Sequence, residues 1–411
     1  MKNAVMYGAG NIGRGFIGHL FSQSGYEVTF IDINQAVIQR LNTDKAYPIR
    51  IVSHDGYKEI NITNVRGVSG ANVESVADEI SKADIMATAV GVNVLPKIAK
   101  PIAFGLKKRW ENKNFNPLNI IICENLIDAN KYLEKLIRIE LNDDENKLFD
   151  KNIGLVEASI GRMVPVMTEE MQEGNPLRVY VEEYCELPVE KDAFKGEIPD
   201  IKNMIPFSPF DLYIQRKLYM HNMGHATAAY LGFLNNYTYI WETTRNSTIK
   251  LITLRALLES ATAMSIEHKY ALQKLIEHSD DLIYRFGNKL LGDTVARVGK
   301  DPVRKLSEND RLIGASRLCV KHGITPTYIC IGIAAGYAFS PAGDEFAAKV
   351  RQTVLTQGIE AALSAYSGIK KENPICNIIV DFYNMIVEGK TLEELEQAAE
   401  IKRQSNYGIK E

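Results

Sequence analysis

The chain has 411 residues and a formal net charge of −3, with 45% hydrophobic and 24% charged residues. A chain of this length favours at least two domains, and its composition is ordinary for a soluble globular protein. The small net charge gives no sign of binding to nucleic acid or to a membrane surface. No apolar run reaches the roughly 20 residues that a membrane-spanning helix requires. We therefore expect no nucleic-acid partner and no membrane attachment.

The cysteines and histidines argue against a disulfide framework and against a metal centre. The five cysteines are odd in number, and no two of them have the Cys-x2-Cys spacing. The seven histidines form neither a His-x3-His nor a His-Glu-x2-His pattern, so we expect no structural or catalytic metal. The first residues, Met1 to Tyr7, lack the shape of a cleavable signal. We expect reduced thiols and a cytoplasmic location.

A nucleotide-binding pattern opens the chain. The apolar run 4–7 predicts a buried strand, a Gly-x-Gly-x2-Gly turn follows over residues 8–13, and helical spacing of apolar residues begins at residue 16. A second predicted strand, 28–31, ends in Asp32. The glycines let the backbone approach a pyrophosphate, the helix N-terminus offers it free N–H groups, and Asp32 can accept hydrogen bonds from a ribose diol. The predicted cofactor-binding residues of this segment are Gly8, Ala9, Gly10, Asn11, Ile12, Gly13 and Asp32.

Asp32 also predicts which dinucleotide is bound. A carboxylate at this position repels the 2′-phosphate of NADP, and residues 33–35 contain no arginine that could attract it. We therefore expect NAD as the cofactor.

Further strand and helix patterns predict an α/β domain. Residues 36–41 predict a helix, and the alternating residues 48–70 predict a small β insertion with a hairpin turn at Asp55-Gly56. Two buried strands are predicted over 83–90 and 119–123. Ligands of open α/β sheets lie at the carboxyl ends of the strands. Four residues are therefore expected near the reactive end of the cofactor: Thr88, Val90, Gly91 and Asn125.

The second half of the chain predicts a mostly helical domain. Residues 194–211 are rich in Pro, Lys and Asp, which suggests a passage between domains. Beyond them, residues 251–278 predict one long amphipathic helix, and the C-terminal residues also have a helical pattern. We therefore predict a Rossmann-type NAD-binding domain with the small β insertion over residues 1–195, and a mainly helical substrate and catalytic domain over residues 196–411.

Lys217, Asn222 and His225 form the pattern Lys-x4-Asn-x2-His within residues 216–232. On an α-helix that turns about 100° per residue, Asn222 lies about 140° and His225 about 80° from Lys217, so the three side chains share one side. A base, an amide and an imidazole on one side suit proton transfer at an alcohol or a carbonyl. The alternative is a charged helix end that runs into a buried stretch of small residues.

Basic residues concentrate between residues 297 and 311. We predict an anion site here, for a substrate phosphate or carboxylate, because the cations converge beside Gly and Pro turns. A solvated surface loop is the alternative. The candidate substrate-binding residues are Arg297, Arg304, Lys305 and Arg311.

Taken together, these motifs resemble the polyol-specific long-chain dehydrogenase family, whose members are mannitol dehydrogenase-like. The resemblance covers nearly the whole chain, and Lys-x4-Asn-x2-His is its most specific motif. It rests on residues 8–18, 88–91, 117–125, 216–232, 297–299 and 304–313.

The resemblance implies a role for each site residue. Lys217 matches the family's general base. Asn125 and Asn222 match the amides that hold the substrate oxygen, and His225 matches the imidazole that orients the reacting group. The chain length and the basic segment resemble the branch that uses sugar phosphates. The implied reaction is the NAD-dependent interconversion of D-mannitol 1-phosphate and D-fructose 6-phosphate, with a lysine base and without a metal.

One residue departs from the family pattern, because Gly161 stands where close relatives carry an acid. An unphosphorylated polyol or a hexuronate (mannitol, fructuronate or tagaturonate) is therefore an alternative substrate, and a non-catalytic NAD(H) sensor is a more distant alternative. For single residues, Asn125 could cap a helix that begins at Leu126, and His225 could be a core histidine. Arg14 could contact phosphate or lie at the surface. We expect a monomer or a small homo-oligomer.

Overall fold

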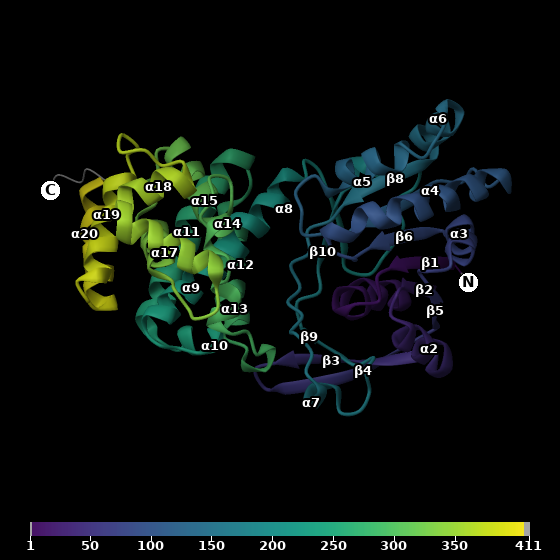
Figure 1. Cartoon of the computed structure of the whole chain (residues 1–411), viewed down its shortest axis with the longest axis horizontal. Helices are drawn as coiled ribbons and strands as arrows, with labels where there is room; N and C mark the ends of the chain where they lie inside the picture. Colours follow the sequence, from purple (N-terminus) through teal and green to yellow (C-terminus); the bar gives the residue numbers. More distant parts are fainter. Residues whose placement is uncertain (1, 407–411) are drawn as a thin grey trace. The chain divides into compact units, whose positions relative to one another are not determined.

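The computed structural model describes residues 2–406 and forms two compact units, Met1–Ile214 and Gln215–Glu411 (Figure 1). The division falls within α8 (Asp211–Gln215). None of the helices in the described residues combines the length and the apolar character needed to cross a membrane.

The division between the units lies later in the chain than the predicted boundary after residue 195, because residues 196–214 are held by the first unit. Strand β11 (Met204–Phe207) pairs in parallel with β10 (Leu187–Glu190). The Ser159 hydroxyl also donates to the Tyr213 carbonyl at 3.1 Å. The segment rich in Pro, Lys and Asp is therefore part of the first unit.

The first unit is built on a parallel sheet with the strand order β5-β2-β1-β6-β7-β8. Both faces of the sheet are buried: Ala4 and Met6 of the first strand belong to one hydrophobic core, and Val5 and Tyr7 to another. This explains why the strands are continuous apolar runs. The order reverses at β1, which is the topology of a dinucleotide-binding sheet and confirms the predicted Rossmann-type fold. The strands are β1 (Lys2–Tyr7), β2 (Tyr26–Asp32), β5 (Val65–Ser69), β6 (Ile85–Thr88), β7 (Leu118–Ile122) and β8 (Ile153–Glu157).

Helices follow most of these strands in the chain. Asn34 and Asn72 cap α2 and α3, each accepting a backbone N–H with its side chain. The helical segments of this unit include η1 (Gly13–Gly18), α1 (His19–Gln23), α2 (Gln35–Asp44), α3 (Val73–Lys82), α4 (Leu95–Glu111), α5 (Ala129–Arg138), α6 (Asp143–Asn152) and α7 (Glu169–Gln172).

The predicted β insertion is present, with two corrections. Strands β3 (Ala46–Ser53) and β4 (Gly56–Thr63) form an antiparallel hairpin, and β9 (Val179–Glu182) adds to β3 in parallel. Ser53 pairs with Gly56, so the turn residues are His54 and Asp55 rather than Asp55 and Gly56. Strand β5, at the end of the predicted insertion, belongs to the edge of the main sheet instead.

The second unit is helical, as predicted. Helix α16 is buried along residues 327–337 and packs against α9, α11 and α19, so it forms the centre of this unit. Its helices are α9 (Met223–Leu234), α10 (Ile240–Thr243), α11 (Ser247–His268), α12 (Leu272–Phe286), α13 (Val295–Gly299), α14 (Pro302–Lys305), α15 (Arg311–Lys321), α16 (Thr327–Ala338), α17 (Glu345–Gln357), α18 (Ile359–Ser367), α19 (Cys376–Val387) and α20 (Leu392–Asn406).

The single long helix predicted over residues 251–278 is wrong. Helix α11 ends at His268, and Lys269 adopts the left-handed conformation with φ of 49°. The Tyr270 N–H then returns to the Ser265 carbonyl at 3.1 Å, which closes the helix end before α12 begins.

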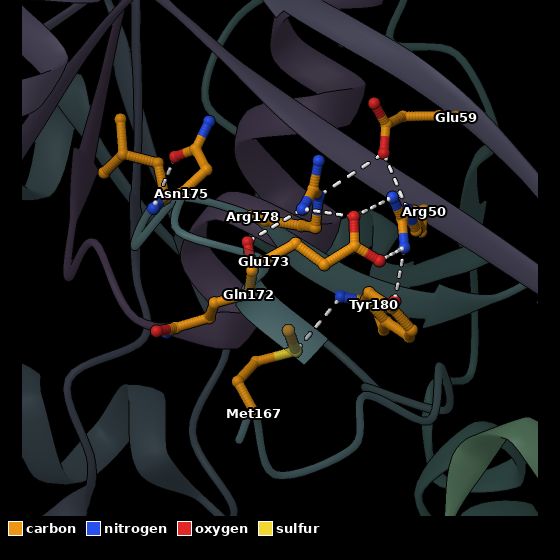
Figure 2. A network of polar contacts seen from close by, with 9 residues as sticks. Arg50, Glu59, Met167, Gln172, Glu173, Asn175, Arg178 and Tyr180 are labelled. Carbon is orange, nitrogen blue, oxygen red and sulfur yellow. Dashed lines mark hydrogen bonds and ion pairs between the residues drawn. The ribbon is translucent and has the colours of Figure 1, made fainter. Parts of the chain in front are cut away.

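A largely buried arginine joins the small sheet to the loop before β9, as Figure 2 shows. The Arg50 guanidinium donates to Glu59 at 2.7 Å and binds both carboxylate oxygens of Glu173, at 2.5 and 2.7 Å. It also donates to the Tyr180 hydroxyl at 2.7 Å. Arg178 lies between the same two acids, 3.4 Å from Glu59 and 3.1 Å from Glu173. The network therefore fixes the loop after α7 against the hairpin.

We expect Arg50→Met to lower the free energy of unfolding by about 1–3 kcal/mol, because bonds to two carboxylates and a hydroxyl are lost together. Lys147→Met serves as the control, since it removes only an exposed ion pair with Asp144 and should leave the unfolding midpoint unchanged. Urea denaturation followed by circular dichroism measures both variants. Equal midpoints for the two variants would contradict a stabilising role for the network.

Candidate active site

The turn between β1 and η1 requires glycine at two positions and leaves a third open. Gly8 has φ of 106°, and a Cβ there would lie 2.3 Å from the Ala89 carbonyl oxygen. A Cβ at Gly13 would lie 2.0 Å from the Gly8 carbonyl oxygen. At Gly10, by contrast, a Cβ would meet no atom within 4 Å. The backbone around Gly10 is therefore open to a ligand, which fits the close approach of a pyrophosphate.

Asp32 lies beside this turn at the end of β2. Its Oδ2 accepts the Ala9 N–H at 2.7 Å, and its Oδ1 accepts the Asn34 N–H at 2.9 Å. A carboxylate has about four acceptor sites. Two backbone bonds therefore leave capacity for a ribose diol, so the turn and the acid together fit a dinucleotide.

The backbone just after β6 is bound by an acidic side chain whose role the sequence motifs did not predict. The buried Glu124 carboxylate accepts the Val90 N–H at 2.9 Å and the Gly91 N–H at 2.8 Å. This fixes the predicted cofactor-binding segment 88–91 against the end of β7. Thr88 itself is completely buried. Glu124 lies directly before Asn125 in the sequence. Its place just after the end of a predicted strand was the only feature of the sequence that could have indicated this role.

Asn125 is exposed and follows β7. The helix that comes next, α5, begins at Ala129 with Asp128 as its N-cap residue. The alternative that Asn125 caps a helix starting at Leu126 is therefore wrong. Its predicted role toward a substrate oxygen stays a prediction.

Arg14 does not lie at the surface. Its side chain is almost entirely buried, and its guanidinium donates to the backbone carbonyls of Ala9 and Leu177. Gly161, at the position of the missing acid, backs onto Tyr184, whose ring would lie 3.3 Å from a Cβ at residue 161.

The Lys-x4-Asn-x2-His stretch is not one continuous α-helix. Residues Arg216–Asn222 (η4) are π-helical, and α9 begins at Met223. Hydrogen bonds in a π-helix join residues five apart. Lys217 and Asn222 are five apart, so they lie nearly one above the other instead of about 140° apart. The α-helical geometry predicted for this pair is therefore wrong. In the π-helix the lysine and the amide side chains point in more similar directions than an α-helix would allow. Lys217, Asn222 and His225 are all partly exposed.

His225 is a neutral imidazole within an aromatic and charged setting. Its ring stacks on Phe286, with centroids 4.7 Å apart and an interplanar angle of 10°. Its Nε2 lies 3.6 Å from an Asp293 carboxylate oxygen and has no hydrogen-bond partner among the described residues. Burial, and then the neighbouring cations, lower the pKa of His225 to about 3. The imidazole is therefore neutral, and its buried Nε2 has unused hydrogen-bonding capacity.

Four cations lie close enough to act on His225: Arg297, Lys305, Arg311 and Arg285, in decreasing order of effect. Three of them were predicted from the basic segment, whereas Arg285 on α12 is distant in sequence and was missed. Arg304, the fourth predicted cation, is not one of these four: its side chain is half exposed, and it pairs with Asp301 at 3.3 Å and with Asp310 at 3.5 Å.

Lys305 is held differently from the arginines around it. Arg297 pairs with Asp293, and Arg311 pairs with Asp310 at 2.7 Å. The buried Lys305 ammonium instead donates to the Val298 carbonyl at 2.6 Å and to the Lys300 carbonyl. Burial, followed by the charges of Arg311 and Arg304, lowers the pKa of Lys305 to about 7. A bound anion would favour its charged form.

Family models match both units of the chain. The mannitol dehydrogenase Rossmann domain matches residues 2–203, and the mannitol dehydrogenase C-terminal domain matches residues 210–387. Among curated relatives, the mannitol-1-phosphate 5-dehydrogenase of Thermoanaerobacter pseudethanolicus is 36% identical over 94% of this chain and 99% of its own length. The protein of the same name from Clostridium acetobutylicum is 38% identical over 92% of this chain and 98% of its own length.

Solved structures share the fold at low sequence identity. A D-sorbitol dehydrogenase in substrate-free form has a TM-score of 0.80 and 13% identity, covering 95% of this chain and 94% of that one. The Pseudomonas fluorescens mannitol 2-dehydrogenase, solved with NAD and D-mannitol, has a TM-score of 0.71 and 12% identity, covering 97% of this chain and 94% of that one. The structural likeness extends to the fold of both units. On the evidence of its sequence matches, the chain belongs to the mannitol dehydrogenase family.

Proposed function

We propose that the chain is an NAD-dependent dehydrogenase that interconverts D-mannitol 1-phosphate and D-fructose 6-phosphate. Relatives named mannitol-1-phosphate 5-dehydrogenase, each matched along nearly its whole length, support this proposal. The observation that carries it is the group of cations around His225, in the same unit as Lys217 and Asn222. A phosphorylated substrate needs such charges, whereas a neutral polyol does not.

The cofactor proposal rests on the turn at Gly10 and on Asp32. Backbone N–H groups at the start of η1 would bind the pyrophosphate, and Asp32 would accept hydrogen bonds from the adenosine ribose and repel a 2′-phosphate. Bound NAD would supply the hydride acceptor for the reaction.

Lys217 is the proposed general base for the substrate hydroxyl. A lysine accepts a proton only when it is neutral, and a free lysine titrates near ~10.4, so its surroundings must favour the neutral amine. His221 lies close to Lys217, and burial holds the pKa of this histidine well below its usual value. The imidazole is therefore neutral and adds no charge beside the lysine. Arg285 acts on the same histidine as Lys217 does, and a cation close to a lysine favours its neutral form.

Asn222 and His225 would hold the reacting oxygen. The Asn222 amide can donate to the developing alkoxide, and removal of one such donor typically lowers the rate by about 10²–10³-fold. The neutral imidazole of His225 can donate through one nitrogen and accept through the other. Asn125 is proposed as a second amide on the family resemblance alone.

The proposed substrate is tested by following the absorbance of NADH with fructose 6-phosphate or with fructose. We expect NADH oxidation only with the phosphorylated sugar. Turnover of fructose alone, or of fructuronate or tagaturonate, would place the chain in a branch that uses unphosphorylated substrates, consistent with the loss of the acid at Gly161. Tight NADH binding without turnover of any of them would point to a sensor.

The same assay tests the cations. Arg297→Met should raise the KM for fructose 6-phosphate by about tenfold or more, because a charge-assisted contact is lost. Lys321→Met is the matched control: it removes an exposed cation of the same unit, paired with Glu267, and should leave the KM unchanged. An unchanged KM in both variants would argue against a phosphate site at Arg297.

The glycine turn between β1 and η1 can also be tested. Gly10→Ala should fold normally, since its Cβ meets no protein atom within 4 Å, but it should weaken NADH binding by about tenfold or more because the Cβ occupies the approach to the backbone. Isothermal titration calorimetry measures the affinity, and thermal unfolding checks the fold. A variant with unchanged affinity would show that no phosphate approaches Gly10.

Lys217→Ala should lower kcat for polyol oxidation by about 10²–10⁴-fold while NADH binding survives. Lys250→Ala, which removes an exposed lysine, serves as the control. In the unmodified protein, oxidation should rise with pH as the base loses its proton. His225 should contribute no step between pH 5 and 9, because its surroundings hold its pKa at about 3. A Lys217 variant with most of its activity would overturn the assignment.

A further inference from the structure

Arg14 is a buried cation placed directly behind the dinucleotide turn. It is the second residue of η1, and only 5% of its surface is exposed. Its guanidinium donates to the Ala9 carbonyl within the turn, and through Nε to the Leu177 carbonyl at 3.2 Å. Both acceptors are backbone carbonyls, which carry only partial negative charge.

Burying a guanidinium against carbonyls alone is unfavourable, so the buried Arg14 lowers stability unless its charge has a further role. Burial lowers the pKa of Arg14, whereas the nearby Asp32 carboxylate raises it. The guanidinium nevertheless stays charged, because arginine does not lose its proton in proteins. The turn therefore has a permanent positive charge behind it, in an environment where solvent screens it weakly.

The peptide group between Ala9 and Gly10 connects this charge to the open side of the turn. In a planar trans peptide the C=O and the following N–H point in opposite directions. Arg14 holds the Ala9 oxygen, so the Gly10 N–H is directed away from the guanidinium. A hydrogen bond to the carbonyl also polarises the peptide and makes its N–H a stronger donor. Gly10 itself is exposed, with no atom within 4 Å of the position of a Cβ.

Other contacts prevent Arg14 from moving away. The Tyr47 hydroxyl donates to the Arg14 carbonyl at 2.7 Å. A Cβ at Gly15 would come within 2.8 Å of Val179, so η1 packs tightly against β9. The Asn11 amide donates to the Pro165 carbonyl at 3.4 Å, on the loop that leads to Leu177. The position of the guanidinium is therefore fixed before any ligand binds.

We propose that Arg14 is a positioning residue for the pyrophosphate of the dinucleotide, acting on the bound anion through the Ala9–Gly10 peptide and through its unscreened charge, without touching it. The inference rests on the proposed function, since it requires a dinucleotide at this turn. It goes further by assigning the phosphate selectivity of the turn to a buried side chain behind it.

The test compares ligands with and without phosphate. In calorimetric titrations, Arg14→Met should weaken binding of NADH and ADP by about tenfold or more, and should leave binding of adenosine within about twofold. Arg14→Lys keeps the charge and should recover most of the affinity for ADP. The slope of log Kd for ADP against log salt concentration should be smaller for Arg14→Met than for the unmodified protein.

Arg109 offers a matched control in the same unit. It is also a buried arginine whose guanidinium donates to backbone carbonyls, those of Ser81, Ala83 and Asn116 at 2.8–3.1 Å. Arg109→Met should lower the unfolding midpoint and leave the affinities for NADH, ADP and adenosine unchanged.

Three results would overturn the inference. The first is equal weakening of ADP and adenosine by Arg14→Met, and the second is a folded Arg14→Lys variant that binds ADP no better than Arg14→Met. The third is unchanged NADH binding by Arg14→Met, which would leave the proposed function intact. If the unmodified protein bound neither NADH nor ADP, the proposed function would fail together with the inference.

Discussion

The first unit depends on the close packing of three backbone segments at one point. Where β1 ends, Gly13 packs against the Gly8 carbonyl, and Gly8 packs against the Ala89 carbonyl, each at a distance that no side chain permits. This contact joins the central strand, the first helix and the neighbouring strand β6 within the width of a peptide group. It places the turn, Asp32 and the segment after β6 at the same edge of the sheet, where ligands of such sheets bind.

Much of this arrangement was predictable because its signals are local. Three glycines, a helical spacing and an acid after the second strand follow one another within residues 8–32, and each has one dominant physical meaning. The structure confirms the strand, turn and helix in that order, and it places the Asp32 carboxylate on the Ala9 N–H. The family prediction, which rested on motifs spread along the chain, is confirmed as well.

The features that escaped prediction are those set by distant partners or by backbone register. Glu124 supports Val90 and Gly91 across 33–34 positions of sequence, and Arg285 reaches the surroundings of His225 from another helix. The break at Lys269 was hidden because apolar spacing continues across it. The π-helical form of residues 216–222 could not be predicted from the spacing of apolar residues. Seven residues are too few to distinguish the number of residues per turn in a π-helix from that in an α-helix.

The π-helical turn at residues 216–222 also has a consequence for how this chain could change over time. A π-helix holds the residues of an α-helical turn plus one more, so it is equivalent to a single-residue insertion absorbed without displacing the flanking helix. Loss of one residue between Lys217 and Asn222 would restore an ordinary α-helix and could leave the packing of α9 intact. The lysine and the amide would then be four residues apart, about 40° from each other around the helix, and would still share one face. A deletion that the fold tolerates would therefore also preserve the pairing, so the number of residues between the two side chains can change by one, while the pairing still requires a lysine and an amide at its two ends.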